Sequence, residues 1–523
     1  MHTDARTLDN GTLIEGDICI VGAGAAGISM ALEWKDTPYK VILLEGGGFD
    51  LEAEMQALYR AENIGRHYYA LEAARWHVFG GTTGHWGGFC APYDPIDFKK
   101  RDWVPHSGWP IEREDLDPYY ARAQQVVGIG PPEYWNADHW AQQDPRRAQL
   151  PFDEERVWTK MWQFCTTQPE ARFGTYYRDA IVGAENIHLY TYGNVCNIEA
   201  NEPVSQVEGL QVRCLNGKEH QVRARYYVLA CGAIQNARLL LSSNSQASAG
   251  LGNDHDLVGR FFMEHLEVHV AYLLLPALVP LKLYGLNLLE VIEHFDRSRG
   301  ELALSESLQR EHRLLNCTAS LSPVPESEKL TSMFDIFQEY DAGAKFLDRF
   351  YKAYAAYQQG EGKQIDPTQL KEVRLRTRSE PAPNPDSRIL LSEEKDALGV
   401  PRVKLNWQLT EFDKRSMRKT YEVLGQEAGR SGVGRVRLRD WLQEEDDTMW
   451  PDYLSGGWHH MGTARMHDNP QEGVVDANCK IHGLGNLYVA GSAAFTTAGT
   501  ANPTLTLIAL SLRLSDHLKE KMA

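Results

Sequence analysis

Two adjacent histidines, His459 and His460, are well suited by type to move a proton. They lie in the stretch GGWHHMGTARM. An imidazole has its ordinary pKa near neutrality, so either ring could act as a general base. Neighbouring residues of an extended segment face opposite ways, so only one of the two can face a given site. A histidine pair on its own is more typical of a solvated turn or a polar core contact, and the hypothesis therefore needs a partner site.

A glycine motif near the N terminus supplies that partner. The run DICIV is typical of a buried parallel strand, and Gly22, Gly24 and Gly27 follow it as the GxGxxG that opens a helix. These glycines allow a tight turn, a close approach of the backbone to a pyrophosphate, and close packing of helix on strand. A second apolar run, KVILLE, ends in Glu45, near the offset of roughly 20 residues at which an acidic side chain meets an adenosine ribose. The pattern predicts a dinucleotide site rather than a chance glycine-rich turn, and leaves FAD and NAD both open.

A second glycine-rich segment, residues 75–98, has the composition of a cofactor contact. Its sequence is RWHVFGGTTGHWGGFCAPYDPIDF, and its glycines let the backbone pass close to a flat or bulky group because glycine has no Cβ. A glycine-rich surface loop is the alternative interpretation. A buried contact is favoured by side chains that suit a solvated loop poorly, namely Trp76, His77, Phe79, His85, Trp86 and Phe89.

Taken in order along the chain, these motifs resemble the glucose-methanol-choline (GMC) oxidoreductases, a family that binds FAD and oxidises alcohols. The resemblance rests on the GxGxxG, GGTTGHWGG, VLACGAIQNARLLL at 228–241, LVGRFFMEHLEV at 257–268, and the C-terminal GLGNLYVAGSAAF and AGTANPTLTLIALSL. It covers most of the chain except the middle. Within the family, GHWGG and TANPTLT are most similar to pyranose oxidase, C-glycoside 3-oxidases and the large subunits of bacterial sugar dehydrogenases. Fructose dehydrogenase large subunits carry a cysteine cluster for an iron–sulfur centre, and this sequence has none.

The resemblance implies FAD-dependent oxidation of a secondary alcohol on a sugar or glycoside to a ketone, with hydride transfer to flavin N5. The family's histidine stands four residues before the threonine of its GT pair, here Thr463, which selects His459 as general base over His460. The second family position falls on Asn502, whose amide would hydrogen-bond the substrate oxygen, with His460 behind the base. The partners are then a sugar or glycoside and oxygen or another electron acceptor. Oxidation of a non-sugar aliphatic or aromatic alcohol, and a hydroxynitrile-lyase-like reaction, remain alternatives.

The resemblance also indicates which residues contact FAD. His85 stands at the position of the histidine that pyranose oxidase bonds covalently to the flavin 8α-methyl, with Gly84 in place of the preceding threonine, so a covalent link and a non-covalent contact are both open. Ser492 stands where many members have an aspartate. Beyond the GxGxxG glycines and Glu45, the expected contacts are Gly81, Thr82, His85, Trp86, Val195, Ala230, Gly232, Gly491, Ser492 and Thr500.

Composition excludes several other classes of function. The net charge of −17 disfavours nucleic acids and anionic membrane surfaces, whose phosphates it would repel. Eight cysteines without a CxxC predict neither a metal site nor a disulfide framework, and suggest buried thiols in a reducing compartment. The N-terminal segment lacks a signal pattern, so we expect the cytoplasm. The apolar run at 270–289 is broken by Pro276, Pro280 and Lys282, so membrane insertion is not expected.

The length of 523 residues is enough for two domains. We expect an α/β chain, α+β overall, with a Rossmann-like FAD-binding domain assembled from residues 1–100, 190–265 and 456–523. Residues 101–189 and 266–455 would form a substrate-binding domain of sheet and helix. The proline-rich residues 376–388, RTRSEPAPNPDSR, predict a loop or linker.

The middle of the chain contains one strongly periodic segment, residues 331–363. Its aromatic residues recur at helical spacing and predict a helix packed on a core, with a lid or a subunit contact as the functional alternative. The stripe consists of Phe346, Phe350, Tyr354 and Tyr357.

Overall fold

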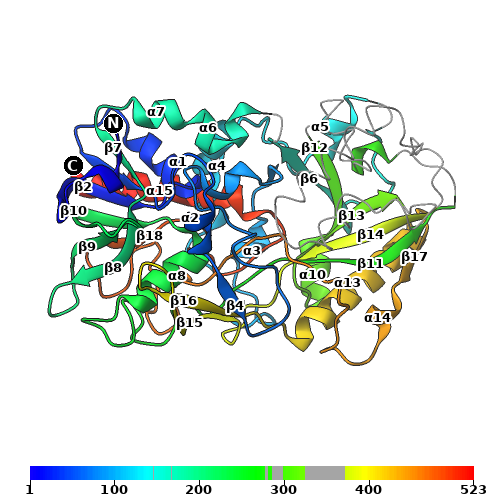
Figure 1. The fold of residues 1–523 in the computed structure, drawn as a ribbon. Coiled ribbons are helices and arrows are strands. Elements are labelled where there is room, and N and C mark those ends of the chain that lie inside the picture. The colour runs from blue at the N-terminus through cyan, green and yellow to red at the C-terminus, as the bar shows by residue number, and fades with distance from the viewer. Residues whose placement is uncertain (145–146, 166–167, 277–280, 285–297, 324–371) are drawn as a thin grey trace.

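The structure is a computed structural model that describes residues 1–144, 147–165, 168–276, 281–284, 298–323 and 372–523. These residues form two lobes that lie side by side in Figure 1, and each lobe is built around one large sheet. Both chain termini lie in the lobe drawn on the left. The aromatic stripe predicted within residues 331–363 lies outside the described residues.

The first lobe contains an eight-stranded sheet in the order β1-β7-β3-β2-β10-β9-β8, with β18 beside β10. Neighbouring strands are parallel along β1-β7-β3-β2-β10, and β18 is parallel to β10, whereas β9 pairs antiparallel with both β10 and β8. Residues 18–21 and 41–44 are apolar runs buried at every position, as expected for parallel strands covered on both faces. The strands are β1 (His2–Asp4), β2 (Leu13–Val21), β3 (Val41–Leu44), β7 (Ile187–Thr191), β8 (Asn194–Ala200), β9 (Val207–Arg213), β10 (Glu219–Leu229) and β18 (Leu487–Val489).

The glycine motif forms the turn between β2 and α1 (Ala25–Trp34), with Gly24 as the residue that caps the helix. Gly22 has a φ of 102°, a backbone conformation that glycine adopts without steric cost. A Cβ at Gly27 would overlap the carbonyl oxygen of Gly22, so only glycine lets this helix begin so close to the strand. The strand, turn, helix and second strand therefore occur where the sequence predicts them.

The second lobe contains an antiparallel sheet in the order β17-β11-β14-β13-β12-β6-β5. Its strands are β5 (Phe89–Cys90), β6 (Val157–Phe164), β11 (Leu266–Leu274), β12 (Ser298–Leu304), β13 (Cys317–Pro323), β14 (Glu372–Ser379) and β17 (Arg435–Leu438). A small third sheet joins β15 (Arg388–Lys395), β16 (Pro401–Asn406) and β4 (Ala61–Asn63).

Helices cover the sheets and hold the C-terminal segment in place. α15 (Pro503–Met522) begins directly after Asn502 and packs against α1 and against α4 (Asp117–Val126). The contact with α4 includes a hydrogen bond of 2.8 Å between Tyr120 Oη and Thr506 Oγ1. The other α-helices are α2 (Ala53–Ala57), α3 (Pro95–Phe98), α5 (Ala137–Ala141), α6 (Phe173–Tyr176), α7 (Arg178–Val182), α8 (Gly232–Ser242), α10 (Glu306–His312), α13 (Glu411–Arg430) and α14 (Asp440–Gln443).

The observed elements agree with the expected α/β class. The domain bounds given above remain a prediction: β5, within 1–100, joins the second sheet, and β7, which crosses the expected boundary at residue 189, joins the first. One local expectation is right only in part: residues 380–387 form the predicted loop, but the ends of the predicted segment belong to strands. The predicted loop at 376–388 begins inside β14, which continues to Ser379 because the prolines that break the strand start only at Pro381.

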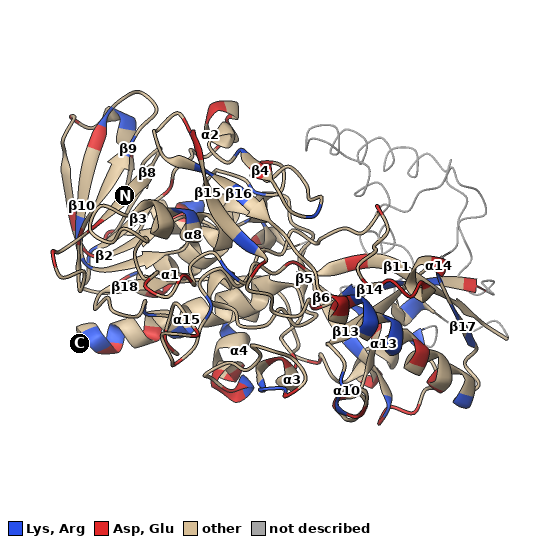
Figure 2. Ribbon diagram, turned by 90° about the horizontal axis from the view of Figure 1, so that it is seen from below, with Lys and Arg blue, Asp and Glu red and all other residues tan. Residues whose placement is uncertain are grey.

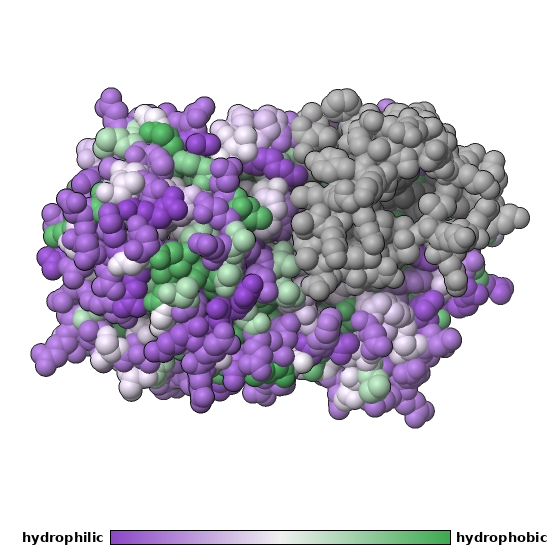
Figure 3. All heavy atoms as spheres, viewed as in Figure 1, coloured by the Kyte–Doolittle hydropathy of each residue, from purple (hydrophilic) through white to green (hydrophobic). Residues whose placement is uncertain are grey.

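The surface is mixed in charge and mostly hydrophilic. Figure 2 shows acidic and basic residues interspersed over both lobes. Hydrophilic residues cover most of the coloured part of the face drawn in Figure 3, with small hydrophobic patches on the lobe that carries the termini. Among the helices of the described residues, none combines the length and the apolar composition that a bilayer-spanning helix needs.

Candidate active site

A cavity of about 830 Å³ is lined by residues of both large sheets. Its wall runs from the glycine turn after β2 to Glu267 on β11 and Arg378 on β14. The volume lies within the range of pockets that hold cofactors and small substrates. The predicted site residues found in the wall are Gly22, Gly24, Glu45, Gly81, Thr82, His85, Trp86, Val195, Ala230, Gly232, His459, His460, Gly491, Ser492 and Asn502.

Two of the predicted cofactor residues do not reach this wall. Gly27 faces the backbone of Gly22, where it permits the helix–strand contact. Thr500 is fully buried, and its Oγ1 lies 3.2 Å from Nζ of Lys160, a buried lysine of β6 that also pairs with Asp94 at 2.7 Å. Thr500 therefore anchors the segment before Asn502 to the second lobe.

Glu45 lies at the end of β3 and is buried in the cavity wall. Its carboxylate accepts hydrogen bonds from the backbone N–H groups of Ala23, at 3.0 Å, and Gly47, at 2.8 Å. Burial raises the pKa of Glu45, while these backbone donors act in the opposite direction. These hydrogen bonds stabilise the glycine turn, and the carboxylate lies at the position where a ribose contact is expected.

The loop after residue 80 places His85 in contact with two indole rings. The His85 ring centroid lies 4.4 Å from that of Trp76 and 5.4 Å from that of Trp458. A side chain at Gly84 would overlap the Trp76 ring, which gives a steric reason for glycine at that position. Burial lowers the pKa of His85 to about 4, so its imidazole is neutral at pH 7.

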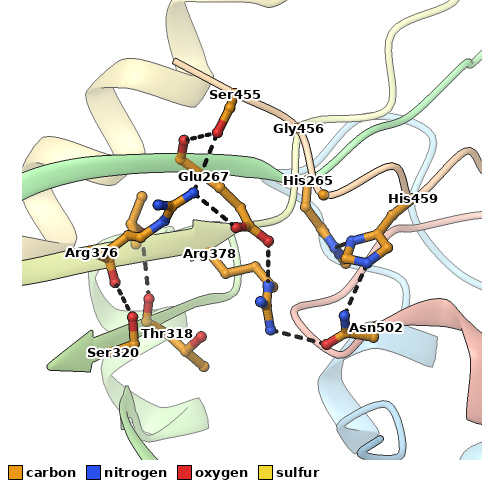
Figure 4. A network of polar contacts seen from close by, with 12 residues as sticks. His265, Glu267, Thr318, Ser320, Arg376, Arg378, Ser455, Gly456, His459 and Asn502 are labelled. Atoms are coloured by element: carbon orange, nitrogen blue, oxygen red, sulfur yellow. Dashed lines mark hydrogen bonds and ion pairs between the residues drawn. The ribbon is translucent and has the colours of Figure 1, made fainter. Parts of the chain in front are cut away.

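His459 and Asn502 meet directly in the cavity (Figure 4). The Nδ2 of Asn502 lies 2.9 Å from Nε2 of His459. The other ring nitrogen of His459, Nδ1, lies 2.8 Å from Nδ1 of His265. Burial, His265 and Arg378 hold the pKa of His459 well below its usual value, so the ring is neutral at rest. A neutral imidazole with a nitrogen lone pair in a cavity is the form that a general base requires.

A buried carboxylate, Glu264, shapes the loop that carries His459. Ser455 forms a β-bridge with Glu267, and Met461 forms one with Met263. The longer segment between residues 455 and 461 therefore bulges outward beside residues 263–267. Glu264 accepts hydrogen bonds from the backbone N–H groups of Gly457, at 3.1 Å, and His459, at 3.0 Å. A Cβ at Gly457 would overlap the His459 ring, so glycine is needed for the ring to fold back over the loop.

His460 faces a different set of partners from His459. Tyr68 Oη lies 2.9 Å from Nε2 of His460 and donates its hydrogen to Glu264, so the imidazole must donate to the tyrosine oxygen. The hydroxyl of Ser492 donates to the carbonyl of His460 at 2.7 Å. Burial lowers the pKa of His460 to about 3. His460 is therefore held in the cavity wall by these hydrogen bonds, whereas His459 contacts Asn502.

An ion-pair cluster orients Asn502 from the side of the second sheet. Arg378 donates from Nη1 to Oδ1 of Asn502 at 3.0 Å and from Nε to Glu267 at 2.9 Å. Arg376 also contacts Glu267, at 3.2 Å (Figure 4). Burial alone would raise the pKa of Glu267, but the two guanidinium groups hold it well below its usual range. The carboxylate is thus ionised and fixes Arg378 against the amide.

Several residues of this network have no predicted role in the sequence analysis. Glu264, His265 and Glu267 lie in the segment LVGRFFMEHLEV, which carried the family resemblance without any assigned function. Their type was a signal, because acidic residues and a histidine are unusual where a strand enters a core. Arg378 lies in the segment that the sequence analysis predicted as a loop, so it was assigned no role, although it belongs to β14.

The cavity fits FAD at both ends. At Gly24, which caps α1, and at Gly232, the first residue of α8, a Cβ would meet no atom within 4 Å, which leaves open space at helix N-termini that favour phosphate. Glu45 stands where a ribose is expected, and the neutral His459 lines the same cavity. These features are those of an oxidoreductase that binds a dinucleotide such as FAD.

Comparison with known families agrees with this class and gives it a name. Residues 17–247 match the FAD dependent oxidoreductase family, and residues 383–511 match the GMC oxidoreductase family. The chain is an FAD-dependent oxidoreductase, and its residues 383–511 form a GMC oxidoreductase C-terminal domain.

Individual relatives match nearly the whole chain at low identity. The fructose dehydrogenase large subunit of Gluconobacter japonicus is 26% identical, over 84% of this chain and 80% of that one. The 6'''-hydroxyparomomycin C oxidase of Streptomyces lividus is 24% identical, over 97% and 92%. The crystal structure of formate oxidase superposes with a TM-score of 0.57 at 16% identity, covering 98% of this chain and 99% of that one, which supports the fold alone.

Proposed function

We propose that this protein oxidises a secondary alcohol of a sugar or glycoside to a ketone. The observation that carries the proposal is the contact of 2.9 Å between His459 Nε2 and Asn502 Nδ2 in a cavity that also contains the dinucleotide turn. When bound, FAD supplies the hydride acceptor, at N5. The protein's own residues must then bind the hydroxyl, remove its proton and hold the carbon in place.

In this proposal, His459 accepts the hydroxyl proton at Nε2 and Asn502 donates a hydrogen bond to the substrate oxygen. A hydroxyl that enters between them can donate to the imidazole and accept from the amide, replacing their direct contact. Arg378 keeps the amide turned with Nδ2 toward the histidine. His459 is neutral at pH 7 because burial lowers its pKa, so it needs no prior deprotonation.

A sugar or glycoside is supported by the relatives and by the polar wall. A fructose dehydrogenase large subunit and a 6'''-hydroxyparomomycin C oxidase are both similar to most of this chain. Beside His459, the wall contains Glu267, Arg376 and Ser455, whose polar groups suit a compound with several hydroxyls.

The mode of FAD attachment is a separate part of the proposal. His85 is a neutral, buried imidazole in the cavity wall, which suits either a covalent bond to the flavin or a packing contact. Precipitation of the protein with acid distinguishes the two: yellow colour in the pellet indicates a bond. Replacement of His85 by alanine should then release the colour to the supernatant.

The proposed function is tested by an anaerobic screen. The purified protein is mixed with free sugars, glycosides, and simple aliphatic and aromatic alcohols, and loss of flavin absorbance at 450 nm (roughly the usual flavin band) is followed. We expect bleaching by a sugar or glycoside, and admission of air then tells whether oxygen is an acceptor. Bleaching only by simple alcohols would contradict the substrate class. Turnover of a cyanohydrin without any bleaching would instead favour the lyase alternative.

A further inference from the structure

We infer that His265 is a positioning residue that holds His459 in the tautomer with hydrogen on Nδ1, leaving the lone pair of Nε2 for the substrate. The inference rests on the proposed function, because it assigns His265 a task only if His459 is the base. It follows from a chain of hydrogen bonds in which each donor is fixed by its neighbour (Figure 4).

The chain begins at two backbone carbonyls. Nε2 of His265 lies 3.1 Å from the carbonyl oxygen of Ala498 and 3.0 Å from that of Gly499. A carbonyl oxygen can only accept, so this ring nitrogen must carry the hydrogen. Burial lowers the pKa of His265 to about 4, so the ring is neutral and its Nδ1 bears a lone pair.

The lone pair on Nδ1 of His265 determines the tautomer of His459. The two Nδ1 atoms are 2.8 Å apart, and a hydrogen bond between them needs one donor. Because His265 can only accept there, His459 must donate, and its hydrogen is on Nδ1. The Nε2 of a neutral His459 is then an acceptor.

The hydrogen bonds of the Asn502 amide, on the other side of His459, indicate the same tautomer independently. Oδ1 of Asn502 lies 3.0 Å from Nη1 of Arg378 and 3.3 Å from Nε1 of Trp162, and both of these groups can only donate. The amide nitrogen of Asn502 therefore faces His459 and donates to Nε2. Two separate groups of residues thus define one protonation pattern.

The position of His265 also links the two segments that meet in the cavity. Its ring contacts the loop of His459 through one nitrogen and the segment just before Asn502 through the other. A second histidine, rather than a carboxylate, at this point fixes the tautomer without adding a negative charge that would stabilise the imidazolium at rest.

The inference is tested with two substitutions of nearly equal shape, His265→Asn and His265→Leu. The asparagine oxygen can still accept from His459 Nδ1, whereas leucine cannot. The rate of anaerobic flavin reduction and the apparent substrate Kd are measured on the holoenzyme with a substrate from the screen. We expect the leucine variant to be reduced about 10 to 100 times more slowly than the asparagine variant, with similar Kd values, because base positioning acts on the chemical step. Equal reduction rates would overturn the inference.

His220→Asn provides a matched control. His220 is also buried and bonded to a backbone carbonyl, that of Ala5, but it lies in β10 and outside the cavity wall. We expect its substitution to leave the reduction rate within about threefold of wild type. A loss as large as that of His265→Leu would assign the effect to general destabilisation.

A measurement on the wild-type protein covers the case in which the His265 variants do not bind FAD. Histidine labelled with ¹⁵N gives separate resonances for protonated and bare ring nitrogens, and the His459 signals are identified by their loss in His459→Gln. We expect Nδ1 in the protonated range and Nε2 in the bare range. The reverse assignment would overturn the inference, whereas wild-type reduction in His459→Gln would instead refute the proposed function.

Discussion

The dinucleotide turn and the His459–Asn502 centre line one cavity but are built in opposite ways. The turn is local: residues 17–45 contain the strand, the glycines, the helix and the acid. The centre combines β11, β14 and β6 with two C-terminal segments, and its contacts join residues separated by 43 to 340 positions. Local steric requirements define the first, whereas long-range hydrogen bonding defines the second.

The largest effect should come from the turn. Gly27→Val would overlap the Gly22 carbonyl, so we expect a loss of stability of about 1–3 kcal/mol or more, with loss of bound FAD and of activity. Denaturant unfolding and the FAD content per chain measure both effects.

Gly24→Val is the matched control, because a Cβ at Gly24 meets no protein atom within 4 Å. It should reduce FAD content while leaving the unfolding of the FAD-free chain within about 0.5 kcal/mol of wild type. Equal destabilisation by both substitutions would contradict the division between packing at Gly27 and cofactor approach at Gly24.

A smaller effect is expected from the charge beside the base. Asn502→Asp places a carboxylate next to His459 Nε2, favours the imidazolium, and so raises the pKa of His459 from its lowered value; Arg378 offsets part of this. The active form is the neutral ring, so flavin reduction should slow about 10- to 100-fold at pH 7 and recover as pH rises. Rates measured across pH 6 to 9 test this, in roughly the range where a histidine titrates.

Asn502→Ala separates charge from the loss of the amide. It should slow reduction without moving the pH dependence upward, because no negative charge is added. The charges and ionisable groups that already face His459, namely Glu267, Arg378, His265 and His460, are unchanged in both variants. Identical pH profiles for the two variants would contradict the electrostatic argument.

The smallest effect concerns stability. Burial raises the pKa of Glu264 to about 7, so the folded state binds a proton that the unfolded chain releases near its ordinary value of 4.5. Stability contributed by this group is therefore full below that value and is lost as pH rises toward 7. We expect Glu264→Gln to lower the Tm overall, because the amide keeps only one of the two acceptor oxygens, but to flatten its decline between pH 5 and 7. A wild-type slope in the variant would contradict the assignment.

The two regions also differ in what could be predicted from sequence. The turn was predicted because its apolar runs and glycine spacing have a local steric cause, which does not depend on the rest of the fold. The segment with Glu264 and His265 was noticed, but its role depends on which segment lies beside it, here residues 455–461. Arg378 was placed in a loop because prolines a few residues later dominated the local pattern. The expected contact of Thr500 with the flavin stays a prediction; in the structure, a buried lysine from β6 contacts its hydroxyl.

The most direct test of the account is the rate of anaerobic flavin reduction in His459→Ala, compared with wild type at equal FAD content and pH 7. If Nε2 of His459 accepts the substrate proton, reduction should slow by about a hundredfold or more while FAD remains bound. Reduction at the wild-type rate would show that the base lies elsewhere, and the assigned centre would be wrong.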